Sequence, residues 1–252
     1  MVGCLVFPIY QEGYEEKDNM FTTIPSQYDE IKDWQWIDFK PFADQLLAMD
    51  ITENNIALWL TGYTQFSNLI MELGQQAQVA TTCDTTDEEA NHRFLRFNDA
   101  ILPEVMKVQN ALDKKWVASG IVPEGMDVPI RNIKAELELF QESNLPLISK
   151  ENNLTTEYDR VIGAQTVELD GEEVTLAQLS PVFTELDRDR REAAWRLSFE
   201  RRVQDRDTLN DICRRFLVIR KAIANNAGMS DYRAYKWKQL KRFDYAPDDA
   251  LA

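Results

Sequence analysis

The chain has 252 residues, 44% of them hydrophobic and 28% charged, proportions typical of a folded globular protein rather than a disordered one. It holds 43 Asp and Glu residues against 28 Lys and Arg residues, and the resulting charge of −15 disfavours binding to nucleic acid or to an anionic membrane. With only 9 Gly and 9 Pro residues, the composition favours long helices and argues against sandwiches, barrels and collagen-like structures.

Residues 1–20 are expected to be an irregular leader. The first ten residues are apolar but too few to span a bilayer, and they lack the basic start of a signal peptide. The three cysteines, Cys4, Cys83 and Cys213, are far apart and odd in number, which predicts free thiols in a reducing compartment. We therefore expect a soluble, cytoplasmic protein.

The region 52–119 predicts a long antiparallel helical hairpin, because only a short turn separates two helical seams. Thr52 is expected to cap the first helix, and a capping box at Thr86 to open the second. Pro103 should kink the second helix or restart it at that point, and Gly120 should end it. Apolar residues recur at steps of three and four in both, at Ile56, Trp59, Tyr63, Phe66, Ile70, Leu73, Ala77 and Ala80, then at Phe94, Phe97, Ile101, Val105, Val108, Leu112 and Trp116. We expect these seams to form core rather than a partner-binding surface.

The stretch 121–160 is expected to be a looser region, punctuated by proline, around one helix at about 130–141. A β-hairpin is predicted at 166–176, since alternating apolar residues flank Asp170-Gly171, a strong hairpin-turn signal.

The last third of the chain predicts three further helices. Asp187 should cap the first, which runs to about residue 203 and turns inward Ala194, Trp195, Phe199 and Val203. The second, opened by Asp205 or Asp207, carries a broad apolar stripe at Leu209, Ile212, Cys213, Phe216, Leu217, Ile219, Ile223 and Ala224. Ser230 should cap the third. Helix-start signals then appear around Pro247, only a few residues before the sequence stops, and we interpret this as a truncated gene or an expressed fragment.

The residues themselves predict no catalytic group and no metal ligand in this chain. A zinc site of the H-E-x-x-H type needs two imidazoles on one helix face, and the sequence contains a single histidine, His92. Because His92 lies in a charged helical stretch, we expect a solvated surface residue rather than the base of a Ser-His-Asp triad. No glycine-rich phosphate loop is present. The scattered carboxylates indicate solvated helix surfaces, and the arginines between 188 and 206 indicate i,i+4 ion pairs with nearby acids.

A series of short runs, in one order along the chain, carries more information. After residue 161 the runs are VTL (174–176), REAAWR (191–196), LN (209–210), RKAIANNAG (220–228), DYRAY (231–235) and RFDYAPDD (242–249). Upstream they are ATTCDTTD (80–87), ELF (138–140) and IGAQTVE (162–168). From about residue 21 to its end the chain resembles the oligoendopeptidase F branch of the thimet-oligopeptidase-like zinc metallopeptidases.

This resemblance implies a mainly helical fold of roughly twice this length, with a peptide channel between two lobes and zinc held by H-E-x-x-H and a more distant Glu. None of these ligands has a counterpart in the present sequence, so zinc is expected only in the complete enzyme. The implied organisation is the leader 1–20, an N-terminal helical lobe 21–160 that contains the hairpin 52–119, and residues 161–252 as the β-hairpin and first helices of the peptidase domain.

The leading hypothesis is that the chain is the N-terminal portion of a zinc-dependent metalloendopeptidase that hydrolyses short peptides. It would form a wall of the channel and be inactive alone. Expected partners are short peptides in the complete enzyme, a second copy of the chain through the apolar stripe from Leu209 to Ala224, or a C-terminal catalytic half. No nucleic acid or membrane partner is expected. Two alternatives remain: a non-catalytic helical module that offers the hairpin 52–119 to a protein partner, and one chain of a split peptidase.

Overall fold

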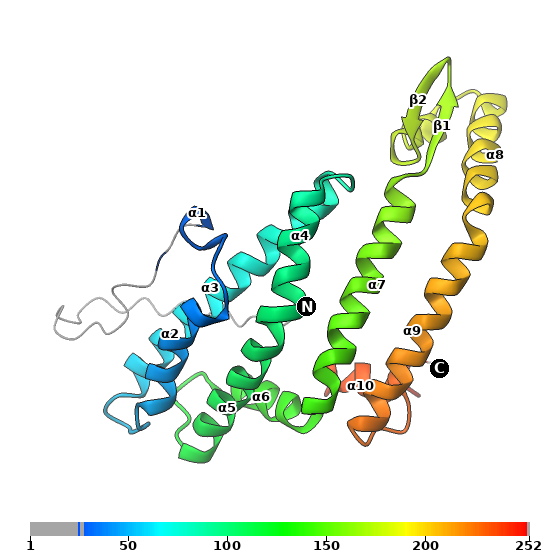
Figure 1. Ribbon diagram of the computed structural model, residues 1–252. Coiled ribbons are helices and arrows are strands. Elements are labelled where there is room, and N and C mark those ends of the chain that lie inside the picture. Colours follow the sequence, from blue (N-terminus) through cyan, green and yellow to red (C-terminus); the bar gives the residue numbers. More distant parts are fainter. Residues whose placement is uncertain (1–24, 26–27, 251–252) are drawn as a thin grey trace.

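The computed structural model describes residue 25 and residues 28–250, so the predicted leader 1–20, with Cys4, lies outside the described residues. Within the described part the fold is mainly α-helical, as predicted, with a single two-stranded antiparallel sheet (Figure 1). None of the helices in that part combines the length and the apolar character needed to cross a membrane.

The first half of the chain forms a helical lobe whose centre is the predicted hairpin. Figure 1 shows α3 lying beside the helical column formed by α4 and α5. The elements of this lobe are α1 (Tyr28–Ile31), α2 (Trp36–Ala48), α3 (Ile56–Cys83), α4 (Glu88–Arg96), the π-helical turn η1 (Phe97–Ile101), α5 (Leu102–Ser119) and α6 (Asp127–Leu139). The prediction of a hairpin over 52–119 is confirmed.

The seams of the hairpin form the core, as the sequence predicts. Trp59 and Phe66 from α3 and Leu112 and Trp116 from α5 are fully buried, together with Phe39 from α2. The apolar period of 3.5 residues thus selects the inward faces of both long helices. Gly120 ends α5 in the left-handed conformation, with φ 70°, which confirms the predicted stop.

Three predicted helix caps are wrong by one to three residues. The N-cap of α3 is Asn55 rather than Thr52, because the Asn55 carboxamide oxygen accepts the backbone N–H of Thr52 and closes a turn before the helix. The N-cap of α4 is Asp87 rather than Thr86, and its carboxylate accepts the backbone N–H groups of Glu89 and Ala90. Asp231 rather than Ser230 caps α10 (Tyr232–Gln239). In the last two cases an adjacent Asp competes successfully with Thr or Ser for the same donors.

At Pro103, where a kink or a restart of the helix is predicted, the π-helical turn η1 comes first and α5 then begins at Leu102. Pro103 is the second residue of α5, where its missing N–H costs no helical hydrogen bond. The turn holds Asn98, which is 1% exposed. The Asn98 carboxamide donates to the carbonyl oxygen of Ser149 (2.9 Å) and to Oδ1 of Asn153 (2.8 Å). It also accepts from Nδ2 of Asn152 (2.7 Å), so η1 is tied to the next long helix.

The expectation of a looser region over 121–160 is wrong. Besides α6 this stretch contains the short 3-10 turn η2 (Glu142–Asn144) and the 19-residue helix α7 (Leu145–Gly163). Pro146 begins α7 rather than interrupting it. The helix buries only Leu145, Ser149 and Leu154, so it offers no apolar period that the sequence could reveal.

The C-terminal part begins with the predicted hairpin and continues in two long helices. Asp170 and Gly171, at φ 57° and 84°, form the two-residue turn between β1 and β2, and Leu169 pairs with Glu172. The elements are β1 (Thr166–Leu169), β2 (Glu172–Thr175), the 3-10 turns η3 (Ala177–Leu179) and η4 (Val182–Thr184), α8 (Arg188–Gln204), α9 (Arg206–Asn226) and α10. In Figure 1, α8 and α9 follow one another nearly in line, and α7 runs beside α9.

The lower end of α9 is anchored in a second core cluster. Ile223 and Ala224 of α9 pack with Leu139 at the end of α6 and Tyr235 of α10. On the α9 stripe the burial of Ile212, Ile223 and Ala224 confirms the prediction, but Cys213 and Leu217 are exposed. The same error recurs on α8, where Ala194 is buried while Trp195, Phe199 and Val203 are exposed.

Candidate functional site

The residues that the sequence singled out for chemistry do not come together. His92 lies exposed on α4, as predicted. Cys83, at the end of α3, and Cys213, on α9, are exposed free thiols. Among the residues that the structure describes, no three His, Cys, Asp or Glu side chains lie close enough together to hold a metal ion.

The candidate functional site is instead an apolar surface on α8. Of the 17 residues of this helix only Ala194 and Ser198 are buried. Trp195, Phe199 and Val203 follow at steps of four and therefore share one face, where they are 49%, 48% and 59% exposed. The Trp195 and Phe199 rings lie 4.3 Å apart between centroids. We call these three residues the α8 apolar row.

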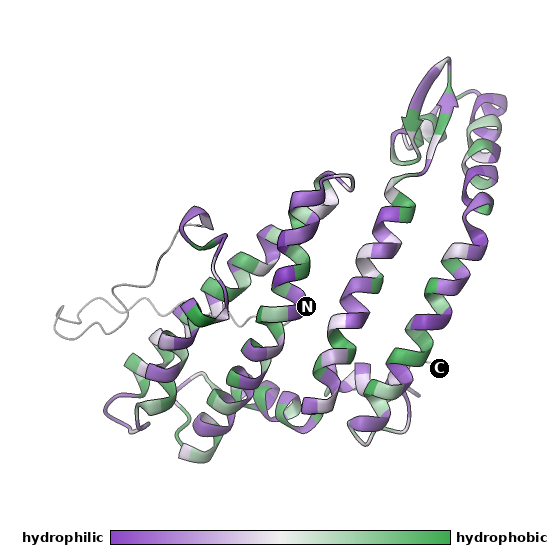
Figure 2. Ribbon diagram, viewed as in Figure 1, coloured by the Kyte–Doolittle hydropathy of each residue, from purple (hydrophilic) through white to green (hydrophobic). Residues whose placement is uncertain are grey.

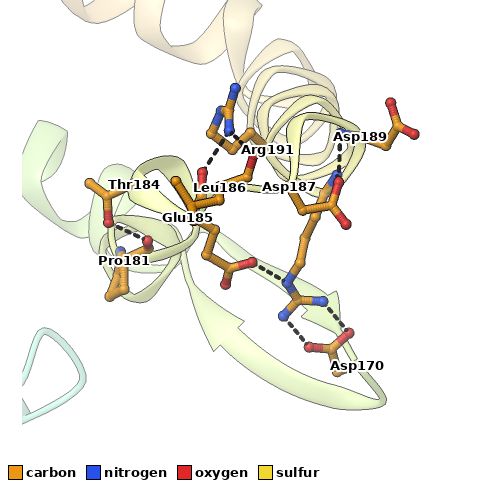
Figure 3. Close-up of polar contacts among 9 residues, drawn as sticks. Asp170, Pro181, Thr184, Glu185, Leu186, Asp187, Asp189 and Arg191 are labelled. Carbon is orange, nitrogen blue, oxygen red and sulfur yellow. Dashed lines mark hydrogen bonds and ion pairs between the residues drawn. The ribbon is translucent and has the colours of Figure 1, made fainter.

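A network of hydrogen bonds fixes the N-terminal end of α8 to the β-hairpin (Figure 3). The Arg190 guanidinium donates to both carboxylate oxygens of Asp170 at the hairpin turn, at 3.1 and 2.6 Å, and pairs with Glu185 at 2.8 Å. Hydrogen bonding from Arg190 lowers the pKa of Asp170 below its usual value. Asp187 caps the helix as predicted, by accepting the N–H groups of Asp189 and Arg190.

A second set of contacts fixes the C-terminal end of α8. The Asp205 carboxylate, at the junction between α8 and α9, accepts from Nε2 of the buried Gln165 (2.9 Å) and from Arg201 (2.6 Å). Hydrogen bonds from Gln165 and Arg201 lower the pKa of Asp205. Because Gln165 directly precedes β1, the helix is attached to the hairpin at both ends and the α8 apolar row is held in a fixed position.

The charges around the α8 apolar row are predominantly positive. The predicted i,i+4 ion pairs are present between Arg196 and Glu192 and between Arg201 and Asp205. Arg188 and Arg202 are both exposed and have no carboxylate within 4 Å among the described residues. Each stands seven residues from Trp195, so both lie on the face of the helix that carries the row.

A second exposed apolar area lies on α9. Leu217 and Val218 are 68% and 70% exposed. Val218 also lines an open groove of about 580 Å³ between α7 and α9, together with Leu154 and Ile219. Lys150, Arg214 and Arg215 border this groove, and Glu157, which also lines it, pairs with Arg215 at 2.8 Å. Figure 2 shows how hydrophobic and hydrophilic residues alternate along α8 and α9.

The buried acid Asp113 was not predicted, because the sequence assigned the carboxylates to solvated helix surfaces. Asp113 of α5 is 3% exposed and accepts hydrogen bonds from the Tyr63 hydroxyl (2.7 Å) and from Nε2 of Gln109 (3.1 Å). Its proximity to the seam residues Leu112 and Trp116 was the available signal. Burial raises the pKa of Asp113 to about 6, against the opposing effect of these hydrogen bonds; Glu136 raises it further and Lys241 lowers it.

We expect Asp113 to make the protein less stable as the pH rises from about 4 to about 6. The folded-state pKa lies above the unfolded-state pKa of about 4, so over this interval the folded protein keeps a proton that the unfolded chain has released. A shift of about two units corresponds to about 3 kcal/mol. In Asp113→Asn this fall should be absent, as measured by urea denaturation from pH 4 to 8. Asp44→Asn, on the exposed surface of α2, is the control, and an unchanged pH profile in Asp113→Asn would contradict the prediction.

Solved structures with a similar fold identify the architecture. A structure described as oligoendopeptidase F, from crystals grown by microfluidic seeding, aligns with a TM-score of 0.77 and 21% identity over 90% of this chain and 42% of its own. PZ peptidase A with an inhibitor aligns with 0.76 and 23% over 85% and 39%, respectively. An oligoendopeptidase F from Bacillus anthracis aligns with 0.71 and 16% over 88% and 43%. Neither family models nor curated proteins match the sequence.

The chain spans about two fifths of the length of these structures. At such identities the comparison establishes the fold alone. The described residues therefore adopt the fold of one part of oligoendopeptidase F-like peptidase structures.

Proposed function

We propose that this chain is the N-terminal portion of a zinc-dependent oligopeptidase that hydrolyses short peptides, and that its long helices form part of a channel wall. The observation that carries the proposal is the alignment of 90% of the chain with a minor part of a longer peptidase chain, at a TM-score of 0.77. The order of short sequence runs between residues 80 and 249 supports it independently.

The residues of this chain do not fit a catalytic zinc ion. The sequence has one histidine and no H-E-x-x-H, and His92 has no group of further donor side chains around it in the described part of the chain. We therefore assign zinc binding and peptide cleavage to residues of the complete enzyme that are not among these 252. The contribution of the present chain is structural: it provides α7, α8 and α9 as rigid walls.

The coding DNA beyond codon 252 tests this proposal. We expect an open frame in phase that encodes H-E-x-x-H on a helix and a Glu further on. A separate gene that encodes this motif, with a product that co-purifies with the chain, would instead identify a split peptidase. The proposal fails if neither the continuing frame nor a co-purifying chain carries the motif.

The structure gives less support to an interaction module built on the hairpin 52–119. Its apolar seams are buried in the lobe, where Trp59, Phe66 and Trp116 contribute to the core, and so they are not available to a partner. The exposed apolar side chains of α8 and α9 belong to the other half of the chain.

A further inference from the structure

The exposure of the α8 apolar row is unusual for an amphipathic helix. An amphipathic helix normally packs its apolar stripe inward. Here α8 packs against η4 and β1 through a face whose buried residues are the small Ala194 and Ser198, while Trp195, Phe199 and Val203 face solvent. A contiguous apolar group of this kind, which includes two aromatic rings in close contact, marks a protein–protein contact surface.

We infer that the α8 apolar row is the docking surface for the part of the peptidase fold that this chain does not contain. The inference rests on the proposed function. In each of the three similar structures about three fifths of the chain lies beyond the matched part. That remainder must cover some surface of the matched part, and Trp195 and Phe199 are the largest exposed apolar side chains on α8 and α9.

The charges indicate the chemistry of the covering surface. Arg188 and Arg202 share the face of Trp195 and have no carboxylate within 4 Å among the described residues. Leaving two guanidinium groups unpaired beside a buried contact is unfavourable, so the covering surface should present apolar side chains bordered by carboxylates. Trp and Arg are also the residue types that contribute most to binding free energy at interfaces.

Hydrogen bonds at both ends of α8 fix the position of the docking surface before any contact forms. Arg190 and Asp170 fix one end of α8 and Asp205 with Gln165 fixes the other, so docking need not order the helix. Side chains that are already positioned lose less conformational entropy when they are covered. A rigid, exposed apolar row therefore fits permanent coverage by a second part of the same protein better than an occasional encounter.

The substitution Phe199→Glu tests the inference when it is made in two proteins: the 252-residue chain and the same chain extended by the residues encoded beyond codon 252. In the short chain the change should leave the thermal midpoint within about 1 °C, because residue 199 is exposed, but should reduce the binding of a hydrophobic dye. In the extended protein it should lower the midpoint by about 5 °C, because it places a charge in a covered apolar contact. Val203→Glu should act in the same way.

The matched control is Val79→Glu, which introduces the same charge at a 54% exposed position on α3 and should change neither protein. Equal midpoints for the extended protein with and without Phe199→Glu would overturn the inference, as would a stop codon directly after residue 252. Sedimentation of the 252-residue chain tests whether a second copy of the chain covers the row instead. A dimer that Phe199→Glu dissociates would assign the row to a second copy and overturn the inference. The thermal midpoint tests the docking surface, and the peptidase activity of the extended protein is measured separately. The inference and the proposed function can therefore fail independently.

Discussion

Replacing Trp59 with alanine is expected to lower the free energy of unfolding by about 3–5 kcal/mol, as measured by urea denaturation. Trp59 is fully buried; its rings stack on the Tyr63 ring at 5.3 Å between centroids and lie tilted against the Trp116 rings at 6.2 Å. Its indole N–H donates to the carbonyl oxygen of Leu46 at 3.0 Å, which ties α3 to α2. The substitution leaves a cavity and removes this buried hydrogen bond at once.

Trp195→Ala is the matched control, because it removes the same side chain from a half-exposed position on α8. Its effect on the 252-residue chain should be below about 1 kcal/mol. Equal losses for the two substitutions would contradict the assignment of the main core to the seam between α3 and α5.

Asn98→Asp is expected to destabilise the protein by about 3–5 kcal/mol, although it changes a single side-chain group. The Asn98 amide nitrogen donates to the carbonyl oxygen of Ser149 and to side-chain oxygens of Asn153 and Asp99. A carboxylate there would face these three acceptors with no donor of its own, at a position that is 1% exposed. The two hydrogen bonds that Asn98 donates to Ser149 and Asn153 of α7 would be lost.

The exposed Asn210 on α9 provides the control, since Asn210→Asp should change stability by less than about 0.5 kcal/mol. Both variants can be compared by thermal and urea denaturation at pH 7. A loss below about 1 kcal/mol for Asn98→Asp would mean that the contacts between η1 and α7 contribute little to holding the two halves of the chain together.

The sequence predicted those parts of the fold in which burial follows a simple period. The α3 and α5 seams, the turn at Asp170-Gly171 and the cap at Asp187 are all local signals, and each is confirmed. Helix α7 escaped prediction because it is held by polar contacts, such as those of Ser149 with Asn98, which leave no apolar period. Caps shifted to Asp87 and Asp231 because competition between neighbouring polar side chains depends on backbone geometry.

The candidate site was predictable only in part. The spacing of Trp195, Phe199 and Val203 correctly indicates one apolar face, but a period cannot tell whether anything covers that face. The burial of Asp113 likewise depends on where α3 lies, since Tyr63 is 50 residues away in the sequence and yet bonds to it. The sequence places Asp113 beside the seam residues Leu112 and Trp116, but its contact with Tyr63 is set by tertiary packing and has no local signature.

The central proposal, that this chain forms one part of an oligopeptidase fold but lacks its catalytic residues, is tested most directly by a peptidase assay. Hydrolysis of a short fluorogenic peptide is measured with added zinc, with and without a chelator, for the 252-residue chain and for the chain extended beyond codon 252. We predict zinc-dependent cleavage by the extended protein alone. Zinc-dependent cleavage by the purified 252-residue chain, abolished by the chelator, would contradict the proposal.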